Sequence, residues 1–323
     1  MSRFPLSFFG LQGSRDIAER IATRLEVPLA RHEERSFEDG EHKTRALEQV
    51  RGHDVFVLHA LYGEPAQSGN DKLCRLLFFC GALKDAGAAR VTAITPYLCY
   101  ARKDRRTKPN DPVTTRYLAG LFEAVGFDAL IALEVHNVAA IENAFRMPFW
   151  HIETAPLFAS HFAAALRNQS PGQPVVVVSP DAGGAKRAEQ LRQSLEPMLH
   201  ADVGSATMEK FRSGGVVSGG LLAGEVRGKV AVIVDDLIST GGTLVRAAEA
   251  CRAAGATRVL AAAAHGLFID GAPELFATPA IDGITVTNTV PPFRLAAEAA
   301  LRLTVLDVSD AVARAIAACH DAG

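Results

Sequence analysis

The segment Val230–Gly255, VAVIVDDLISTGGTLVRAAEACRAAG, decides the fold. Its first five residues form an apolar, β-branched run, which predicts a buried strand. The turn Ser239–Thr243 carries two glycines and separates this run from a segment with helical periodicity. A strand, a tight turn and a helix in this order make up part of a βα unit. Such units build parallel sheets flanked by helices.

The rest of the chain repeats this alternation of apolar runs and helical segments. Two stretches, ALKDAGAARVTAITPY at 82–97 and ACRAAGATRVLAAAAH at 250–265, share the pattern helix, Ala-Gly, Arg-Val, strand. This similarity indicates two copies of one α/β domain. Met-Pro and Ala-Pro dipeptides near 146–154 suggest a boundary. We therefore predict tandem domains over 1–147 and 148–323, each a mainly parallel sheet flanked by helices, and leave open whether the final helix packs on the first domain.

Composition narrows the class of protein. The chain has 323 residues, 48% of them hydrophobic, which is enough for two domain cores. Its net charge of -2, with no charged tail, gives no reason to expect nucleic acid or an anionic membrane as a partner. The five cysteines form no CxxC pair, which fits a reducing compartment better than a disulfide framework or a zinc site. No apolar run approaches the ~18 residues that span a bilayer, so we expect a cytoplasmic protein.

Two adjacent acids and a hydroxyl- and glycine-rich turn form the sharpest candidate site. Ligands of open parallel sheets bind beyond the carboxyl ends of the strands. Glycines let the backbone approach a phosphate, and the following helix N-terminus supplies free N–H groups. A phosphorylated sugar fits, with its phosphate in the turn and its hydroxyls on the carboxylates. A solvated acidic pair beside an ordinary turn is the simpler alternative. The predicted ligands are Asp235, Asp236, Ser239, Thr240, Gly241, Gly242 and Thr243.

This stretch resembles the diphosphoribosyl-binding motif of type I phosphoribosyltransferases and of ribose-phosphate diphosphokinases. Four further segments, in the right order, resemble the second family. The loop 36–41, SFEDGE, is similar to the loop that reaches the adenine of ATP on a neighbouring subunit. Segment 96–105, PYLCYARKDR, is similar to the ATP-binding segment. Residues 134–136, EVH, stand where the family has Asp-Leu-His at its metal-nucleotide site. Segment 179–187, SPDAGGAKR, matches one whose Asp lies near metal and ribose.

The resemblance implies transfer of the diphosphoryl group of ATP to ribose 5-phosphate, with Mg²⁺ as cofactor. It assigns ATP binding to Phe37, Asp39, Glu41, Arg102, Lys103 and Asp104, and the metal to His136 and Asp181. It assigns catalysis to Lys210 and Arg212, at the start of the glycine-rich stretch 211–225. We expect this stretch to be a mobile loop that can contain a short hairpin. The resemblance also implies a homo-oligomer whose ATP site is shared between subunits.

Three of these segments have simpler physical interpretations. The sequence DGE at 39–41 is a turn signal, and by itself it more often marks a loop than a site. A charge run such as 102–106 is usually a solvated face, although its place after a strand favours an anion. A lone histidine such as His136 is more often a core residue than a ligand.

The chain departs from the family pattern in places. Ser239 stands where many members have an acid, Lys103 replaces a Gln, and Glu134 replaces an Asp. Residues 107–114 lack the family's Ser-Arg-x-Pro signature, so activation by phosphate and inhibition by ADP stay open. A non-catalytic regulatory subunit and a two-domain phosphoribosyltransferase are the alternatives. The first should have lost catalytic-loop cations or strand-end acids, and the second does not explain SFEDGE and YARKDR.

Overall fold

The computed structural model describes residues 4–213 and 216–323, and the side chains of all of these except residues 209–220. The chain forms two compact units, Met1–Ile152 together with Val308–Gly323, and Glu153–Asp307. The first unit runs past the predicted boundary at 147, because strand β7 (Phe149–Ile152) still pairs with the first sheet. The final helix α10 (Ser309–Asp321) also belongs to the first unit.

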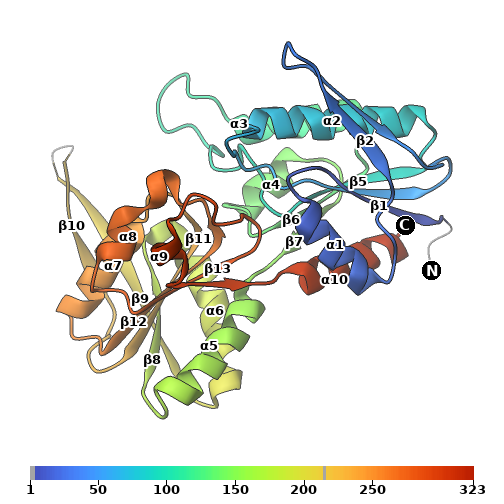
Figure 1. Ribbon diagram of the computed structural model, residues 1–323. Coiled ribbons are helices and arrows are strands. Elements are labelled where there is room, and N and C mark those ends of the chain that lie inside the picture. Colours follow the sequence, from blue (N-terminus) through green and yellow to red (C-terminus); the bar gives the residue numbers. More distant parts are fainter. Residues whose placement is uncertain (1–3, 214–215) are drawn as a thin grey trace. The chain divides into compact units, whose positions relative to one another are not determined.

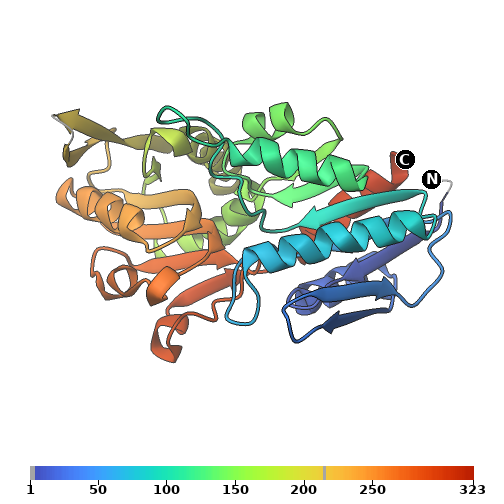
Figure 2. The ribbon, with the colours of Figure 1, turned by 90° about the horizontal axis from the view of Figure 1, so that it is seen from above.

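The described part of the first unit contains a five-stranded parallel sheet. Its strands, in order across the sheet, are β1 (Leu6–Gly10), β4 (Asp54–Leu58), β5 (Arg90–Thr95), β6 (Ala129–Leu133) and β7. Helices α1 (Arg15–Leu25) and α10 cover one face, and α2 (Gly69–Asp85) and α3 (Thr114–Val125) cover the other (Figure 1). Figure 2 shows α2 and α3 running side by side. The short helix α4 (Val138–Ala144) follows β6.

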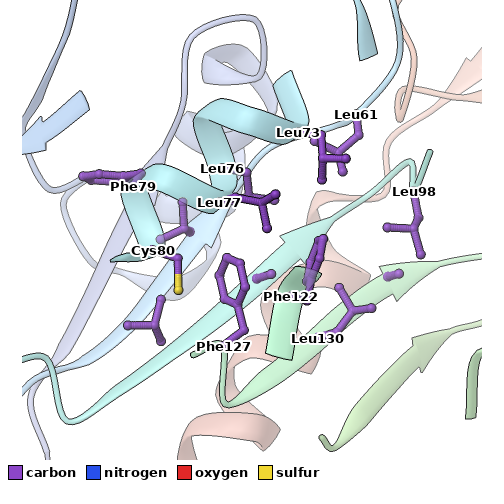
Figure 3. Packing of buried hydrophobic residues seen from close by; sticks show 14 of the residues in the cluster. Leu61, Leu73, Leu76, Leu77, Phe79, Cys80, Leu98, Phe122, Phe127 and Leu130 are labelled. Atoms are coloured by element: carbon purple, nitrogen blue, oxygen red, sulfur yellow. The ribbon is translucent and has the colours of Figure 1, made fainter. Parts of the chain in front are cut away.

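Alternation along the strands builds the core of this unit. Phe9 of β1 packs toward α2, where its ring meets that of Phe79 edge-on at 5.3 Å. The ring of Phe56 in β4 instead meets His320 of α10 at 6.3 Å. Figure 3 shows the α2–α3 side of the sheet, where leucines of α2 meet Phe122, Phe127 and Leu130. Burial of both faces explains why these strands read as unbroken apolar runs.

A separate two-stranded antiparallel sheet, β2 (His32–Ser36) with β3 (His42–Ala46), lies beside α2. The sequence HEERS and HKTRA predicted neither strand. Its charged residues hide the alternation, because the side that faces α2 is itself polar. There Arg75 Nη2 of α2 donates to Ser36 Oγ at 2.7 Å, and Arg75 Nη1 lies 3.7 Å from Glu34 Oε2.

The described part of the second unit forms a seven-stranded sheet, parallel except at one edge. The order is β10 (Val216–Ala223), β9 (Val203–Ser213), β8 (Val175–Ser179), β11 (Val230–Ile238), β12 (Arg258–Gly266), β13 (Gly283–Thr287) and β14 (Leu303–Leu306). Helices α5 (Ala155–Gln169) and α6 (Ala185–Leu199) pack on Val175, Val177 and Val232. Helices α7 (Gly242–Ala253) and α8 (Pro273–Ala277) pack on the opposite face, against Val176, Val178 and Ile233. A further short helix is α9 (Ala297–Ala300).

The predicted duplication is present in atomic detail. In the first unit, Asp128 accepts hydrogen bonds from Lys84 Nζ, in the last turn of α2, and from the amide of the second residue of β5, at 2.5 and 2.6 Å. In the second unit, Asp282 accepts from Arg252 Nη2, in the last turn of α7, and from the amide of the second residue of β12, at 2.5 and 2.7 Å. Both aspartates precede the next strand of their sheet. The same helix-to-strand junction therefore occurs once in each unit.

The hairpin that the sequence allowed within 211–225 is present. The backbones of β9 and β10 pair as an antiparallel hairpin, with an irregularity between Val217 and Gly220. A pair of glycines within a strand marks a bulge as readily as it marks a loop.

Candidate active site

The turn after β11 has the geometry of a phosphate cradle. Residues 239–241 form bends, and α7 begins at Gly242. Gly241 has φ +87°, and a Cβ on it would lie 2.7 Å from Leu275 Cβ. Glycine is thus required there by both backbone and space. The turn delivers the free N–H groups of the helix N-terminus to the carboxyl edge of the sheet, where an anion is favoured.

The acid pair lies inside β11, which extends four residues past the predicted end at Val234. Asp236 is 5% exposed, and its Oδ1 accepts from the Leu237 amide at 3.0 Å. Asp235 is half-buried, and its Oδ1 lies 3.8 Å from Arg187 Nη1. Burial, reinforced by the charge of Asp236, raises the pKa of Asp235 to about 7, and Arg187 opposes this shift. Asp235 therefore keeps its proton to a higher pH than an ordinary carboxyl group does.

Asp181 lies at the end of the neighbouring strand β8, just before a 3₁₀ turn over Ala182–Gly184. Its Oδ1 accepts from the amides of Gly183 and Gly184 at 3.0 and 3.2 Å. Strands β8 and β11 are parallel and paired, so Asp181 and the acid pair share one edge of the sheet. Arg187 belongs to α6, the helix that follows β8 in the sequence, and its guanidinium group reaches Asp235. Sequence reasoning did not assign Arg187 a role, although it closes the quoted segment 179–187.

The backbones of Lys210 and Arg212 belong to β9, where they pair with Gly220 and Val217 of β10. Their side chains lie outside the described residues.

In the first unit, Phe37, Asp39 and Glu41 lie in the loop that joins β2 and β3. The Phe37 amide donates to the Glu41 carbonyl at 2.8 Å, and the Glu41 amide donates to Asp39 Oδ1 at 3.1 Å. All three side chains are exposed, and the guanidinium of Arg35 lies 4.9 Å from the Phe37 ring centroid. The loop thus presents an aromatic ring and two carboxylates outward on a closed turn.

The other predicted ATP residues follow β5, and His136 follows β6, the adjacent strand. Asn137 Nδ2 donates to Asp104 Oδ2 at 2.6 Å and so joins the two strand ends. Arg102 and His136 are exposed beside this bond. The structure therefore brings together two segments that lie far apart in the sequence.

Backbone strain marks both of these strand ends. Tyr100 has φ +58° and Glu134 has φ +43°, the left-handed region that side chains other than glycine rarely adopt. Glu134 is only 5% exposed. Strain of this kind is concentrated at ligand sites, where the surrounding structure holds it in place.

Each unit carries, at the carboxyl edge of a parallel sheet, polar groups suited to a phosphorylated ligand. With its acid pair, glycine turn and helix N-terminus, the second unit defines a phosphoribosyltransferase-type domain. Residues 152–271 match the phosphoribosyl transferase domain, residues 6–126 the N-terminal domain of ribose phosphate pyrophosphokinase, and residues 220–323 the phosphoribosyl synthetase-associated domain.

Similarity to known proteins extends over the whole chain. It is 33% identical to ribose-phosphate pyrophosphokinase 1 of Streptococcus pyogenes serotype M3, over 99% of this chain and 96% of that protein. Identity to the Streptococcus agalactiae enzyme of the same name is 32%, with the same coverage. The crystal structure of phosphoribosylpyrophosphate synthetase from Mycobacterium smegmatis is similar with a TM-score of 0.86 and 31% identity, covering 99% of this chain and 100% of that one. The chain belongs to the ribose-phosphate pyrophosphokinase family, which confirms the resemblance and the predicted fold class.

Proposed function

We propose that the protein is a ribose-phosphate diphosphokinase, which converts ATP and ribose 5-phosphate into phosphoribosyl diphosphate and AMP. The observation that carries this proposal is the acid pair of β11 directly before a turn that requires glycine and opens α7. In a chain of this family, that arrangement suits a ribose 5-phosphate site. The 5-phosphate accepts from the N–H groups of 239–243, and the ribose hydroxyls donate to Asp235 and Asp236.

ATP binds through the first unit in this proposal. The exposed Arg102 pairs with phosphate oxygens, and Asp104, fixed by Asn137, lines the same strand edge. The Phe37 ring and the carboxylates of Asp39 and Glu41 receive the adenine of ATP bound to a neighbouring subunit, which makes the active form a homo-oligomer. Light scattering tests this point, and full activity of a monomer would contradict it.

The small number of side chains available as metal ligands suits Mg²⁺. Among residues 4–213 and 216–323, no three His, Cys, Asp or Glu side chains gather into a metal-binding group. Mg²⁺ commonly keeps several waters and binds through one or two protein groups plus substrate phosphates. Asp181 of the second unit and His136 of the first unit would each supply one such contact, directly or through water. The ion would neutralise charge on the triphosphate.

The reaction needs positioning and charge neutralisation more than covalent chemistry. The anomeric hydroxyl of ribose 5-phosphate attacks the β-phosphorus in line. A new C1–O–P link forms, and the hydroxyl proton is released to solvent. The bond from the β-phosphorus to the oxygen it shares with the α-phosphorus breaks, and AMP leaves with that oxygen. Lys210 and Arg212 would stabilise the charge that develops on the transferred group.

Two finer points follow from the proposal. A non-catalytic regulatory subunit is the alternative, and the chain keeps Lys210, Arg212 and both strand-end acids, which such a subunit has no need of. No helix within the described ranges is long and apolar enough to cross a membrane. The substrates are cytoplasmic metabolites, and we place the protein in that compartment.

A direct assay tests the function. Purified protein is incubated with ATP, ribose 5-phosphate and Mg²⁺, and AMP is measured by chromatography. We expect AMP release that requires ribose 5-phosphate and disappears with EDTA. Release of ADP in place of AMP, or no sugar-dependent release, would contradict the proposal.

A further inference from the structure

The loop between β5 and α3 is organised around one carboxylate. Asp111 Oδ2 accepts from Lys103 Nζ and Thr107 Oγ1, both at 2.7 Å, and from the amides of Lys108 and Thr107 at 2.9 and 3.0 Å. Lys103 Nζ also lies 3.0 Å from Thr107 Oγ1. The hydrogen bond from Lys103, followed by those from Thr107 and Lys108, holds the pKa of Asp111 well below its usual range. The ammonium of Lys103 is therefore turned into the loop and paired there.

Two threonines at the start of α3 hold the main chain of residues 100–103. The hydroxyl of Thr114 lies 3.1 Å from the Tyr100 carbonyl oxygen and 3.4 Å from that of Lys103. The hydroxyl of Thr115, which is 1% exposed, lies 3.3 and 3.4 Å from the same two oxygens. These contacts bracket Arg102 and stabilise the left-handed conformation of Tyr100.

The neighbouring cations are in a different situation. Arg102, Arg105 and Arg106 are exposed, and none of them has an ion-pair partner among the described residues. They remain available to an anionic ligand, whereas Lys103 already has its counter-ion 2.7 Å away. An ammonium that also bound phosphate would have to leave Asp111 or bring that carboxylate close to the triphosphate, and repulsion between the two anions opposes the second arrangement.

We infer that Lys103 and Asp111 are positioning residues, which close the loop 103–111 so that Arg102 and Asp104 face ATP, and that Lys103 is not itself a phosphate ligand. This replaces the direct role that the family resemblance gave to Lys103. The inference rests on the proposed function, because it takes segment 102–104 as part of the ATP site.

Two variants separate positioning from direct binding, because the two roles predict opposite signs. If Lys103 positions the loop, Asp111→Asn and Lys103→Met both weaken ATP, with KM raised roughly three- to tenfold and kcat and the KM of ribose 5-phosphate little changed. The double variant should then bind ATP no more weakly than the single variant with the lower affinity, because both changes break the same contact. Lys103→Arg, which can still pair with Asp111, keeps the wild-type KM.

The contrary outcomes are equally specific. If Lys103 binds phosphate directly, Asp111→Asn frees its ammonium, so the KM of ATP falls or stays constant while Lys103→Met raises it. That result, additive single effects, or no effect of either change would overturn the inference. Glu19→Gln is the matched control, because it removes the exposed ion pair between Arg15 and Glu19 on α1, 2.8 Å apart.

The ATP dissociation constant, measured in each variant without ribose 5-phosphate, gives the same comparison without catalysis. It keeps the two proposals distinguishable. If the wild-type protein makes no AMP, the diphosphokinase proposal is refuted. If Asp111→Asn nevertheless binds ATP more weakly than the wild type, the inference about Lys103 and Asp111 stays intact.

Discussion

Replacing Asp235 by Asn should make the protein more stable at alkaline pH, even though it damages the proposed ribose site. In the native protein, burial and the charge of Asp236 raise the pKa of Asp235 from 3.8 to about 7. The folded state therefore disfavours the ionised carboxyl more than the unfolded chain does. A raised carboxyl pKa means that the folded state keeps its full stability below the unfolded pKa and loses stability as the pH rises through the folded pKa.

The size of the effect follows from the same two values. Each unit of difference in pKa corresponds to about 1.4 kcal/mol, so the shift from 3.8 to about 7 amounts to roughly 4 kcal/mol once Asp235 is ionised. Part of this cost is already present at pH 5, where the unfolded carboxyl has lost its proton. Between pH 5 and pH 8 the cost should grow by on the order of 2–3 kcal/mol. Asn carries no charge at any pH, so the Asp235→Asn variant escapes this increase.

Urea unfolding of the wild type and of Asp235→Asn at pH 5, 6.5 and 8 measures the difference. We expect the free energy of unfolding of the variant, relative to the wild type, to rise steadily with pH by the amount above. Asp202→Asn, at an exposed acid of the same unit, is the control and should give a flat difference. A flat difference for Asp235→Asn as well would show that its carboxyl is not raised in pKa, and the account of the acid pair would fail.

Three further predictions concern the proposed site. The double variant Asp235→Asn with Asp236→Asn should raise the KM of ribose 5-phosphate and lower turnover while leaving ATP binding intact; normal kinetics with ribose 5-phosphate would rule out the contact of these acids with its hydroxyls. Lys210→Ala should lower kcat by ~10²–10³-fold with a modest change in KM, as expected for a donor that acts mainly in the transition state; wild-type turnover would remove Lys210 from the mechanism. Gly241→Ala should weaken ribose 5-phosphate binding more than it weakens ATP binding, because its Cβ would lie 2.7 Å from Leu275 Cβ and force the turn to move. Equal loss for both substrates would argue against a role of this turn in sugar-phosphate binding.

The buried strands were predictable because their sequences are simple. The sequence VVVVS at Val175–Ser179 predicts a buried strand, and β8 has these bounds, because both of its faces are covered by helices and every residue is apolar or small. Strand β11 was predicted too short, because Asp235 and Asp236 look like the start of a loop. In the structure Asp235 pairs with Ala263 of β12 and Leu237 pairs with His265, so β11 continues in register through both acids.

The polar elements could not be read in the same way. The β2–β3 hairpin depends on Arg75, a residue of α2 that lies 39 positions from the Ser36 it contacts. The bond between Asp104 and Asn137 likewise joins residues 33 positions apart. Nor did the sequence reveal that Lys103 pairs with Asp111. Such contacts depend on how strands and helices come together, whereas the motifs around Asp235 and Asp181 are local and were found from residue order alone.

The central claim is that a diphosphoryl group, with its β-phosphorus, moves from ATP to the sugar. The most direct measurement follows ATP labelled with ³²P at the β position in the presence of ribose 5-phosphate and Mg²⁺. The account predicts that the label appears in the sugar product, one label for each AMP formed. Label recovered in ADP, with the γ-phosphoryl group alone transferred, would contradict it.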